Sequence, residues 1–317
     1  MTITKNILLI VICALVLIKA VDIFIETSTK IAQYLKISGY TISFLLVAIA
    51  TSLPEVVVAI TSGVEKKSIL AYGDAMGSNI ALITLVISLP ILLGKDIVTR
   101  SILHSRDAYY ATFFAFLPAL LSIDGNLSRV DGTILIIAYV AYLNSVIRRS
   151  KGIERIMQQF ENINIVKTTG LFLFSLSLLL ASSRGIVLSA ISISAQMGWA
   201  LGFVGLTITA LGTSLPEIAF VISSEAKDNQ REILGDIVGS VVANSTLVLG
   251  LAATIYPIRL GSGSFGSSTI LFLTISLLLF LKFTISKQRL EKFEGLVLIS
   301  VYILFILTEY FLQTQTH

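Results

Sequence analysis

The sequence predicts an all-α membrane protein with ten transmembrane helices, arranged as two inverted five-helix repeats in which helices 2 and 7 are broken inside the membrane. Three observations predict this fold. The 317 residues are 55% hydrophobic and 13% charged, with a mean hydropathy of +0.90, which is more apolar than a soluble domain of this size. Apolar stretches long enough to cross a bilayer recur along the chain. One five-residue motif occurs twice, each time inside such a stretch.

The predicted spans are stretches of about 20 apolar residues, separated by short polar segments. In chain order they cover residues 6–28, 38–62, 70–93, 107–124, 130–147, 168–194, 198–224, 231–255, 266–283 and 293–313. The first stretch has no identifiable small-residue cleavage site, so we expect it to be retained as a helix. Residues 1–147 then form the first repeat, 148–167 a polar cytoplasmic connector and 168–317 the second repeat, within one integral domain.

The distribution of basic residues predicts the orientation. If both termini lie outside, the cytoplasmic loops carry 16 Lys and Arg residues and the outer loops carry 6. Positive charge is retained on the cytoplasmic side, which favours this arrangement. Because these residues are dispersed over short loops, lipid contact explains the net charge of +4 better than nucleic-acid binding. Cys13 is the only cysteine and His104 and His317 are the only histidines, so an intrachain disulfide and a thiolate or histidine metal cluster are excluded.

The second half of the chain repeats the first at an offset of 162 residues. From Ser43 to Ile87 this comparison needs no gap and gives 16 identities in 45 positions. It includes the motif Thr-Ser-Leu-Pro-Glu, at residues 51–55 and again at 213–217. Five spans per half is an odd number, so the second half must enter the membrane from the opposite face. We therefore expect a pseudo-two-fold axis in the membrane plane.

Each copy of this motif places a proline and a glutamate in hydrocarbon, where both are costly. Pro54 and Pro216 cannot donate a backbone hydrogen bond and crowd the carbonyl four residues earlier, so carbonyl oxygens at 48–51 and 210–213 are expected to be partly free. Carbonyl and hydroxyl oxygens suit Na⁺ or Ca²⁺, and Glu55 and Glu217 would supply compensating charge. Two copies in phase favour a shared cation site over two helix kinks with separately satisfied acids.

A second repeated motif, Gly-Asp-x-x-Gly-Ser, begins the following span in each half, at residues 73–78 and 235–240. Small residues four positions apart allow two helices to approach closely. The polar groups of this motif and the next turn share one helical face. They are Asp74, Ser78, Asp236, Ser240 and Asn244. Close packing explains the glycines, and it explains the serines as well as ligand binding does. It does not explain a recurring aspartate.

With these motifs the chain resembles the Ca²⁺/cation antiporter superfamily, and it is most similar to the prokaryotic sodium/calcium exchanger branch. The resemblance covers essentially the full length. It implies a secondary active antiporter that exchanges Ca²⁺ for Na⁺ or H⁺, with ions bound at the bilayer centre between helices 2, 3, 7 and 8 while helices 1 and 6 slide to alternate access. The ligands that it implies are Glu55, Glu217, Thr51, Thr213, Ser52, Ser214, Ser78, Ser240, Asn244, Ala48 and Ala210, with Asp74 and Asp236 as accessory candidates.

Two positions depart from the pattern of this branch. Leu82 stands where an Asn is usual, and Asn244 stands where an Asp is usual. The central cluster therefore has two carboxylates instead of three and lacks one polar ligand. We expect such a site to hold fewer Na⁺ ions or to use protons. Asp74 and Asp236, where related exchangers often have Asn, would partly offset the loss as vestibule or proton-handling groups, or would only cap and cross-link helices.

Asp22 and Arg184 occupy corresponding positions on the two helices expected to slide. They are candidates for an ion pair in one access state. The preferred interpretation is that each reaches the interface or pairs locally, as Lys19 would with Asp22.

Four alternatives remain open. Exchange of H⁺, K⁺ or Na⁺ with little role for Ca²⁺ follows from the reduced acid count, and a degenerate, non-transporting exchanger follows from Leu82 and Asn244. A cation channel is disfavoured by the inverted repeats and the lack of a ring-forming filter. An enzyme is least favoured, because no catalytic triad, zinc motif or nucleotide loop is present. We expect no cofactor and no obligatory protein partner, only transported ions and lipid, in the cytoplasmic membrane of a prokaryote.

Overall fold

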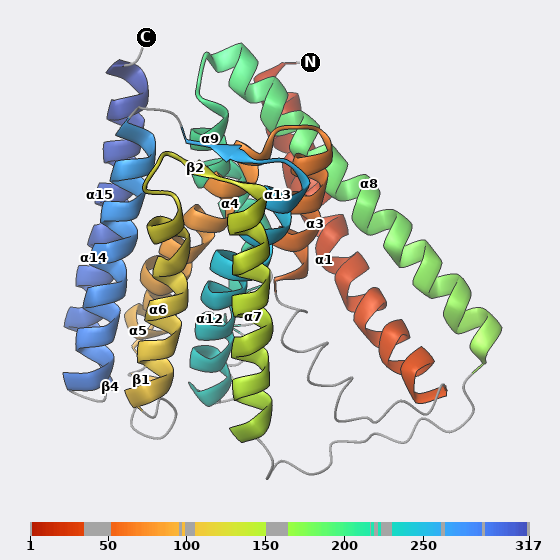
Figure 1. The fold of residues 1–317 in the computed structure, drawn as a ribbon, viewed down its shortest axis with the longest axis horizontal. Coiled ribbons are helices and arrows are strands. Elements are labelled where there is room, and N and C mark those ends of the chain that lie inside the picture. Colours follow the sequence, from red (N-terminus) through yellow and green to blue (C-terminus); the bar gives the residue numbers. More distant parts are fainter. Residues whose placement is uncertain are drawn as a thin grey trace.

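The computed structural model describes residues 2–34, 52–94, 97–98, 105–149, 164–215, 217–218, 221–222, 230–260, 264–286 and 289–315 (Figure 1). The α-helices are α1 (Ile3–Tyr34), α3 (Leu53–Val64), α4 (Ser68–Ala81), α5 (Ile87–Leu92), α6 (Ser105–Leu121), α7 (Arg129–Arg149), α8 (Ile165–Met197), α9 (Leu201–Val204), α10 (Ala210–Thr213), α12 (Gln230–Ala243), α13 (Leu249–Ile255), α14 (Ser264–Ser286) and α15 (Lys292–Gln315). Three π-helical segments are η1 (Leu82–Val86), η2 (Gly205–Thr209) and η3 (Asn244–Val248). Each of the predicted apolar stretches contains a helix in the described part of the chain.

Six helical segments are long and apolar enough to cross a membrane, judged by length and composition within the described residues. They are Ile3–Phe24, Ser68–Leu92, Ile165–Met197, Ile233–Ile255, Gly266–Thr284 and Lys292–Thr314. Shorter apolar helices occur at Leu53–Val64, Thr112–Leu121 and Leu201–Thr213. The segments that complete the second predicted span, residues 38–51, lie outside the described residues.

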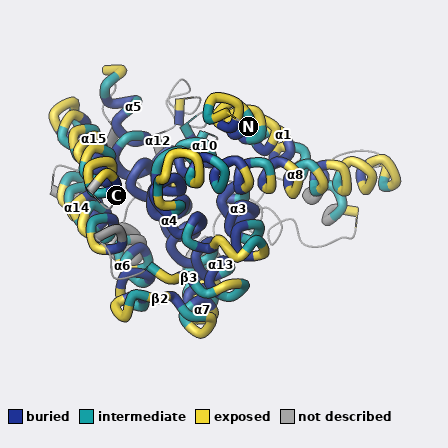
Figure 2. The backbone as a smooth tube through the Cα atoms, turned by 90° about the horizontal axis from the view of Figure 1, so that it is seen from above, coloured by how far each residue is buried: buried dark blue, intermediate teal, exposed yellow. Residues whose placement is uncertain are grey.

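Burial separates these helices into an inner and an outer group. The most apolar windows of Ser68–Leu92 and Ile233–Ile255 are 83% and 78% buried, whereas those of the other four long segments are 28% to 39% buried. Figure 2 shows the same division, with α4 buried at the centre and exposed residues along α8, α14 and α15. An outer helix that exposes apolar side chains on one face is the arrangement expected when the surrounding solvent is lipid. These two inner segments carry the two copies of the Gly-Asp-x-x-Gly-Ser motif.

The two halves contain matching features. The segments η1 and η3 begin at Leu82 and Asn244, which are equivalent positions of the internal repeat. Strand β1 (Ile97–Val98) pairs antiparallel with β4 (Arg289–Leu290), and β2 (Asn126–Leu127) pairs in the same way with β3 (Ile258–Arg259). Each pairing joins a short loop strand of one half to a loop strand of the other. Both strand pairs therefore connect the first repeat to the second.

Helices α1 and α8 form a pair along one side of the molecule (Figure 1). They contain 32 and 33 residues, so each is about 48 Å long and must tilt to fit a ~30 Å hydrocarbon core. Their apolar contacts form a core cluster separate from that of the main bundle. A smaller set of side chains, including Val58 and Leu70, joins this cluster to α3 and α4. The pair is therefore packed onto the bundle through a limited seam.

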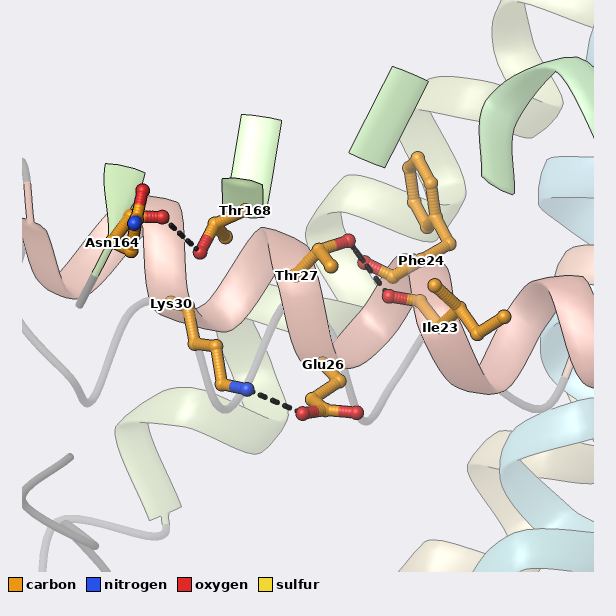
Figure 3. Close-up of polar contacts among 7 residues, drawn as sticks. All are labelled: Ile23, Phe24, Glu26, Thr27, Lys30, Asn164 and Thr168. Atoms are coloured by element: carbon orange, nitrogen blue, oxygen red, sulfur yellow. Dashed lines mark hydrogen bonds and ion pairs between the residues drawn. The ribbon is translucent and has the colours of Figure 1, made fainter. Parts of the chain in front are cut away.

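Figure 3 shows the end of α1 beside the start of α8. The Thr27 hydroxyl donates to the carbonyl of Ile23 at 2.7 Å, and Glu26 forms an ion pair with Lys30. At the first turn of α8, the Asn164 side chain accepts a hydrogen bond from the backbone N–H of Lys167 at 3.1 Å. An Asn that caps the first turn in this way is a common helix start signal. These contacts are local to each helix, and the stacked rings of Phe24 and Phe172 pack α1 against α8.

Candidate cation site

Helix α4 lies between the two copies of the Thr-Ser-Leu-Pro-Glu motif. In the first copy Ser52 is the N-cap of α3 and Glu55 lies in its first turn. In the second copy α10 ends at Thr213, and Ser214 is its C-cap. The motif therefore interrupts the helix in the second half and lies at the start of α3 in the first, where the residues before Ser52 lie outside the described residues. Helix α4 contacts α3, η2 and α10.

Two glycines let α4 approach η2 and α10 closely. A Cβ atom on Gly73 would lie 2.2 Å from the carbonyl oxygen of Gly202, and one on Gly77 would lie 2.3 Å from that of Leu206. No larger side chain fits at these two positions without a shift of backbone. The predicted role of the small residues is thus observed in the first half. A Cβ on Gly235 or Gly239, the equivalent residues of α12, would meet no atom of the described chain within 4 Å.

Polar contacts join α4 to the second motif copy. The Thr213 hydroxyl donates to Oδ1 of Asp74 at 3.0 Å, and the Ser214 hydroxyl donates to that of Ser78 at 3.0 Å. The Ser78 hydroxyl in turn lies 3.4 Å from the carbonyl oxygen of Ala210. That carbonyl also accepts the backbone N–H of Ser214 at 3.0 Å. The Ala210 carbonyl, expected to be partly free, is thus engaged by protein donors, and a cation would have to take the place of a hydroxyl donor there.

The two glutamates of the motif are buried without compensation. Glu55 is 0% exposed and Glu217 is 1% exposed. In the described part of the chain, the carboxylate oxygens of both residues lack a hydrogen-bond partner. Their charges act on one another and on those of Asp74 and Asp236, so the four acids belong to one electrostatic cluster. A buried carboxylate without a partner is costly, and a bound cation is one way to remove that cost.

The remaining predicted ligands on the inner helices are also buried. Ser240 is 1% exposed, and Asn244, at the first residue of η3, is 0% exposed. Neither amide atom of Asn244 has a hydrogen-bond partner among the described residues. Ser52 is also fully buried, and its hydroxyl has no partner among the described residues. Single π-helical turns inside α-helices are frequent at functional sites, because they leave backbone groups out of the regular ladder.

Not every predicted ligand can be placed. Of the predicted ligands, Ala48 and Thr51 lie outside the described residues, and so does Pro216, the proline of the second motif copy. Asp236 is half-buried on α12. Within the described chain, His, Cys, Asp and Glu side chains do not form a group of three or more that could hold a metal ion. The centre is therefore built from two buried glutamates and surrounding hydroxyl, amide and carbonyl oxygens, which is a donor set that hard cations accept.

The sequence argument missed two polar residues of this centre. The Asn79 amide donates to the Ser245 hydroxyl at 2.7 Å and so joins α4 to η3. The Thr209 hydroxyl is fully buried in η2 and has no partner in the described part of the chain. Asn79 corresponds to Val241 in the second half, so comparing the two copies would not reveal it. Its position directly after the Gly-Ser pair was the signal available.

The charged residues of the long helices pair locally or with the bundle. Lys19 and Asp22 form the expected local ion pair at 3.4 Å. Arg184 instead binds Glu65, at the end of α3, with 3.1 Å between Nη2 and Oε1. One turn away, the hydroxyls of Thr61 and Ser183 are 2.8 Å apart. Arg184 therefore connects the long helix to the bundle rather than to Asp22.

Comparison with known proteins decides the family. The family model described as sodium/calcium exchanger protein matches residues 5–148 and again residues 167–311. The chain belongs to this family. It is a multi-pass membrane protein of a family of secondary transporters, with ions as substrates.

Individual members of the family are similar over nearly the whole chain. The provisionally named antiporter CaxA of Alkalimonas amylolytica is 30% identical over 90% of this chain and 93% of its own length. The sodium/calcium exchanger MaX1 of Methanosarcina acetivorans is 26% identical over 98% of this chain and 100% of its own. The solved structure of the sodium-calcium exchanger NCX_Mj superimposes with a TM-score of 0.64 and 23% identity, over 96% of this chain and 99% of that one. This last likeness establishes the shared fold.

Proposed function

We propose that this family member is a secondary active antiporter that exchanges Ca²⁺ for Na⁺ or H⁺ by alternating access. The observation that carries the proposal is the burial of Glu55 and Glu217, from the two copies of one motif, in a single electrostatic cluster, with no hydrogen-bond partner for their oxygens among the described residues. A bound cation would remove the cost of burying these two carboxylates. The names of the relatives MaX1 and CaxA agree with cation antiport.

The proposed site is formed by the residues that the family resemblance implied. Glu55 and Glu217 would hold Ca²⁺ between them, and the hydroxyl, amide and carbonyl oxygens around them would complete its shell. These further ligands are Ala48, Thr51, Ser52, Ser78, Ala210, Thr213, Ser214, Ser240 and Asn244. Because Leu82 and Asn244 reduce the charge and the number of polar ligands, protons are a second candidate for the counter-ion. Ca²⁺ and the counter-ions share the two glutamates and therefore compete, which couples their movements.

Alternating access would be carried by the α1–α8 pair moving against the bundle. The support is that this pair has its own apolar core and meets the bundle through a limited seam. The proposed topology is ten spans in two inverted repeats, residues 1–147 and 168–317, joined by the connector 148–167. Both termini would lie outside the cytoplasmic membrane, in keeping with the 16 basic residues on the predicted inner side against 6 on the outer. The proposal includes neither a chemical reaction nor an obligatory protein partner.

The experiment is ⁴⁵Ca²⁺ uptake into proteoliposomes that are loaded with Na⁺ or poised with a pH gradient. Wild type is compared with Glu55→Gln and Glu217→Gln. The matched control is Glu309→Gln, because Glu309 is also a buried acid on a long apolar helix but hydrogen bonds to Ser268 at 2.7 Å instead of joining the central cluster. We expect uptake in wild type and in the control, and none in the two central variants.

The driving gradient identifies the counter-ion. Uptake driven by outward Na⁺ assigns Na⁺, and uptake driven only by the pH gradient assigns H⁺. Wild-type uptake in Glu55→Gln would refute the site, and absence of uptake under both gradients would refute Ca²⁺ exchange.

A further inference from the structure

Asp74 is the acid of α4 that meets the second motif copy directly. It is 0% exposed, and its Oδ1 accepts the hydroxyl proton of Thr213 at 3.0 Å. Gly73 and Gly205 hold the two backbones together at this point, since a Cβ on Gly205 would lie 3.1 Å from the backbone nitrogen of Asp74. The contact between Asp74 and Thr213 is therefore imposed by helix packing and does not depend on a long, flexible side chain.

The Thr213 hydroxyl has one proton and three acceptors within reach. Asp74 lies at 3.0 Å, the carbonyl oxygen of Thr209 at 3.2 Å and that of Ala210 at 3.3 Å. A carboxylate is the strongest acceptor of the three, because hydrogen bonds to an ionised group are shorter and stronger. When the proton points to Asp74, the lone pairs of the hydroxyl are turned away from it. The two carbonyl oxygens are also released from this donor.

The second oxygen of Asp74 adds charge to the centre. Oδ2 is buried and has no hydrogen-bond partner among the described residues. The charge of Asp74 acts on both Glu55 and Glu217. The Thr213 hydroxyl, which bonds to Asp74, is also near enough to the Glu55 carboxyl group to act on it. In the described part of the chain, ion pairs join Lys19, Lys30 and Arg184 to Asp22, Glu26 and Glu65, and so to none of the acids of the central cluster.

We propose that Asp74 is a positioning residue that sets the preference of the site for divalent over monovalent cations, by orienting the Thr213 hydroxyl and by adding, when ionised, a further negative charge beside Glu55 and Glu217. The inference rests on the proposed function, because it assumes that the two glutamates hold the transported cation. In the family pattern an acid stands at the position of Asn244. Here Asp74 would supply that charge from the other half of the chain, two turns before Leu82, which is the position equivalent to Asn244. Asp74 itself need not touch the ion.

Charge has a measurable signature that a structural role lacks. Coulomb energy is proportional to the charge of the ion, so removing one negative charge costs a divalent cation twice the free energy that it costs a monovalent cation at the same place. A loss of about tenfold in Ca²⁺ affinity should therefore accompany a loss of only about threefold in Na⁺ affinity. A purely structural defect would change both affinities by a similar factor.

The test uses the purified full chain in detergent. The melting temperature is titrated with Ca²⁺ and, separately, with Na⁺ for wild type, Asp74→Asn and the control Glu309→Gln. Asp74→Asn keeps the shape and an acceptor for Thr213 but removes the charge. We expect Asp74→Asn to weaken Ca²⁺ binding by about tenfold or more and Na⁺ binding by about threefold. Glu309→Gln should leave both apparent affinities within about twofold of wild type, because Glu309 is bonded to Ser268 and is not among the acids whose charges act on Glu55 and Glu217.

Equal Ca²⁺ and Na⁺ losses in Asp74→Asn, or wild-type affinities, would overturn the inference while leaving the proposed function in place. If Asp74→Asn does not fold, Asp74→Ser removes the same charge with a smaller side chain and is judged by the same ratio. If Ca²⁺ does not stabilise wild type, Sr²⁺, Mn²⁺ and K⁺ are titrated as well. A divalent cation whose effect depends on Asp74 would then support the inference and refute Ca²⁺ as substrate, and no effect of any cation would refute both.

Discussion

The contact between α4 and η2 gives a prediction whose size follows from the structure. In Gly77→Ala, the added Cβ would lie 2.3 Å from the Leu206 carbonyl oxygen and 2.8 Å from the Ala210 Cβ. The first of these distances must lengthen to roughly 3.4 Å, an ordinary contact, so the two backbones must separate by about 1 Å. A clash with backbone cannot be relieved by a change of rotamer. Overpacking of this kind costs about 1–3 kcal/mol.

The same separation should impair the cation site. Ser78 is the next residue along α4, and its hydroxyl contacts Ser214 at 3.0 Å and the Ala210 carbonyl at 3.4 Å. Lengthening either distance by about 1 Å would break it as a hydrogen bond. We therefore expect Gly77→Ala to lower the melting temperature and to reduce ⁴⁵Ca²⁺ uptake.

The control is Gly170→Ala, on the exposed face of α8, where an added Cβ meets no atom within 4 Å. That change should be neutral or stabilising by up to ~1 kcal/mol, because alanine is the better helix former. If Gly77→Ala were as stable and as active as Gly170→Ala, the close approach of α4 and η2 would not position the site. The reasoning would then be refuted.

Two further predictions follow. Arg184→Gln and Glu65→Gln each remove an ion pair whose side chains are 65% and 28% exposed, so the free energy of unfolding should change by less than about 1 kcal/mol. The rate of Ca²⁺ exchange should rise if α8 must leave α3 during transport. A double-mutant cycle on uptake rates measures this effect, and rates equal to wild type in both single variants and the double variant would show that the pair does not resist the motion. Asn244→Asp combined with Leu82→Asn restores the acid and the amide of the family pattern. The double variant should reach half of its Na⁺-induced melting-temperature shift at a lower Na⁺ concentration than wild type. An unchanged concentration would show that these positions do not bind Na⁺.

Much of the fold followed from features that act along the chain. Long apolar stretches predicted the helices, since a bilayer selects for length and hydropathy before any tertiary contact forms. The boundaries were close, with α8 at Ile165–Met197 against the predicted 168–194 and α12 to α13 ending at Ile255 as predicted. Proline and the small-residue spacing likewise act locally, so the interruption after Thr213 and the close approach at Gly77 could be anticipated.

The candidate site could be predicted as a set of residues but not as a set of contacts. Glu55, Glu217 and Ser78 lie on motifs that repeat, and Asn244 lies one turn beyond one of these motifs. All four are buried, and their role as ligands stays a prediction. The π-helical turns that begin at the equivalent residues 82 and 244 gave no signal in the sequence. A π turn depends on how neighbouring helices accept an extra residue, and hydropathy does not record that.

The sequence by itself determined that this chain is a duplicated, helical membrane protein with two copies of one motif, from which a cation site is predicted, because those properties depend on residue type and spacing. The tertiary structure alone decided that Thr213 bonds to Asp74 and that Arg184 bonds to Glu65 instead of Asp22. These partners lie more than a hundred residues apart in the chain. Which of them meet depends on the rotation and depth of each helix in the bundle, and these are set by the packing of many side chains together.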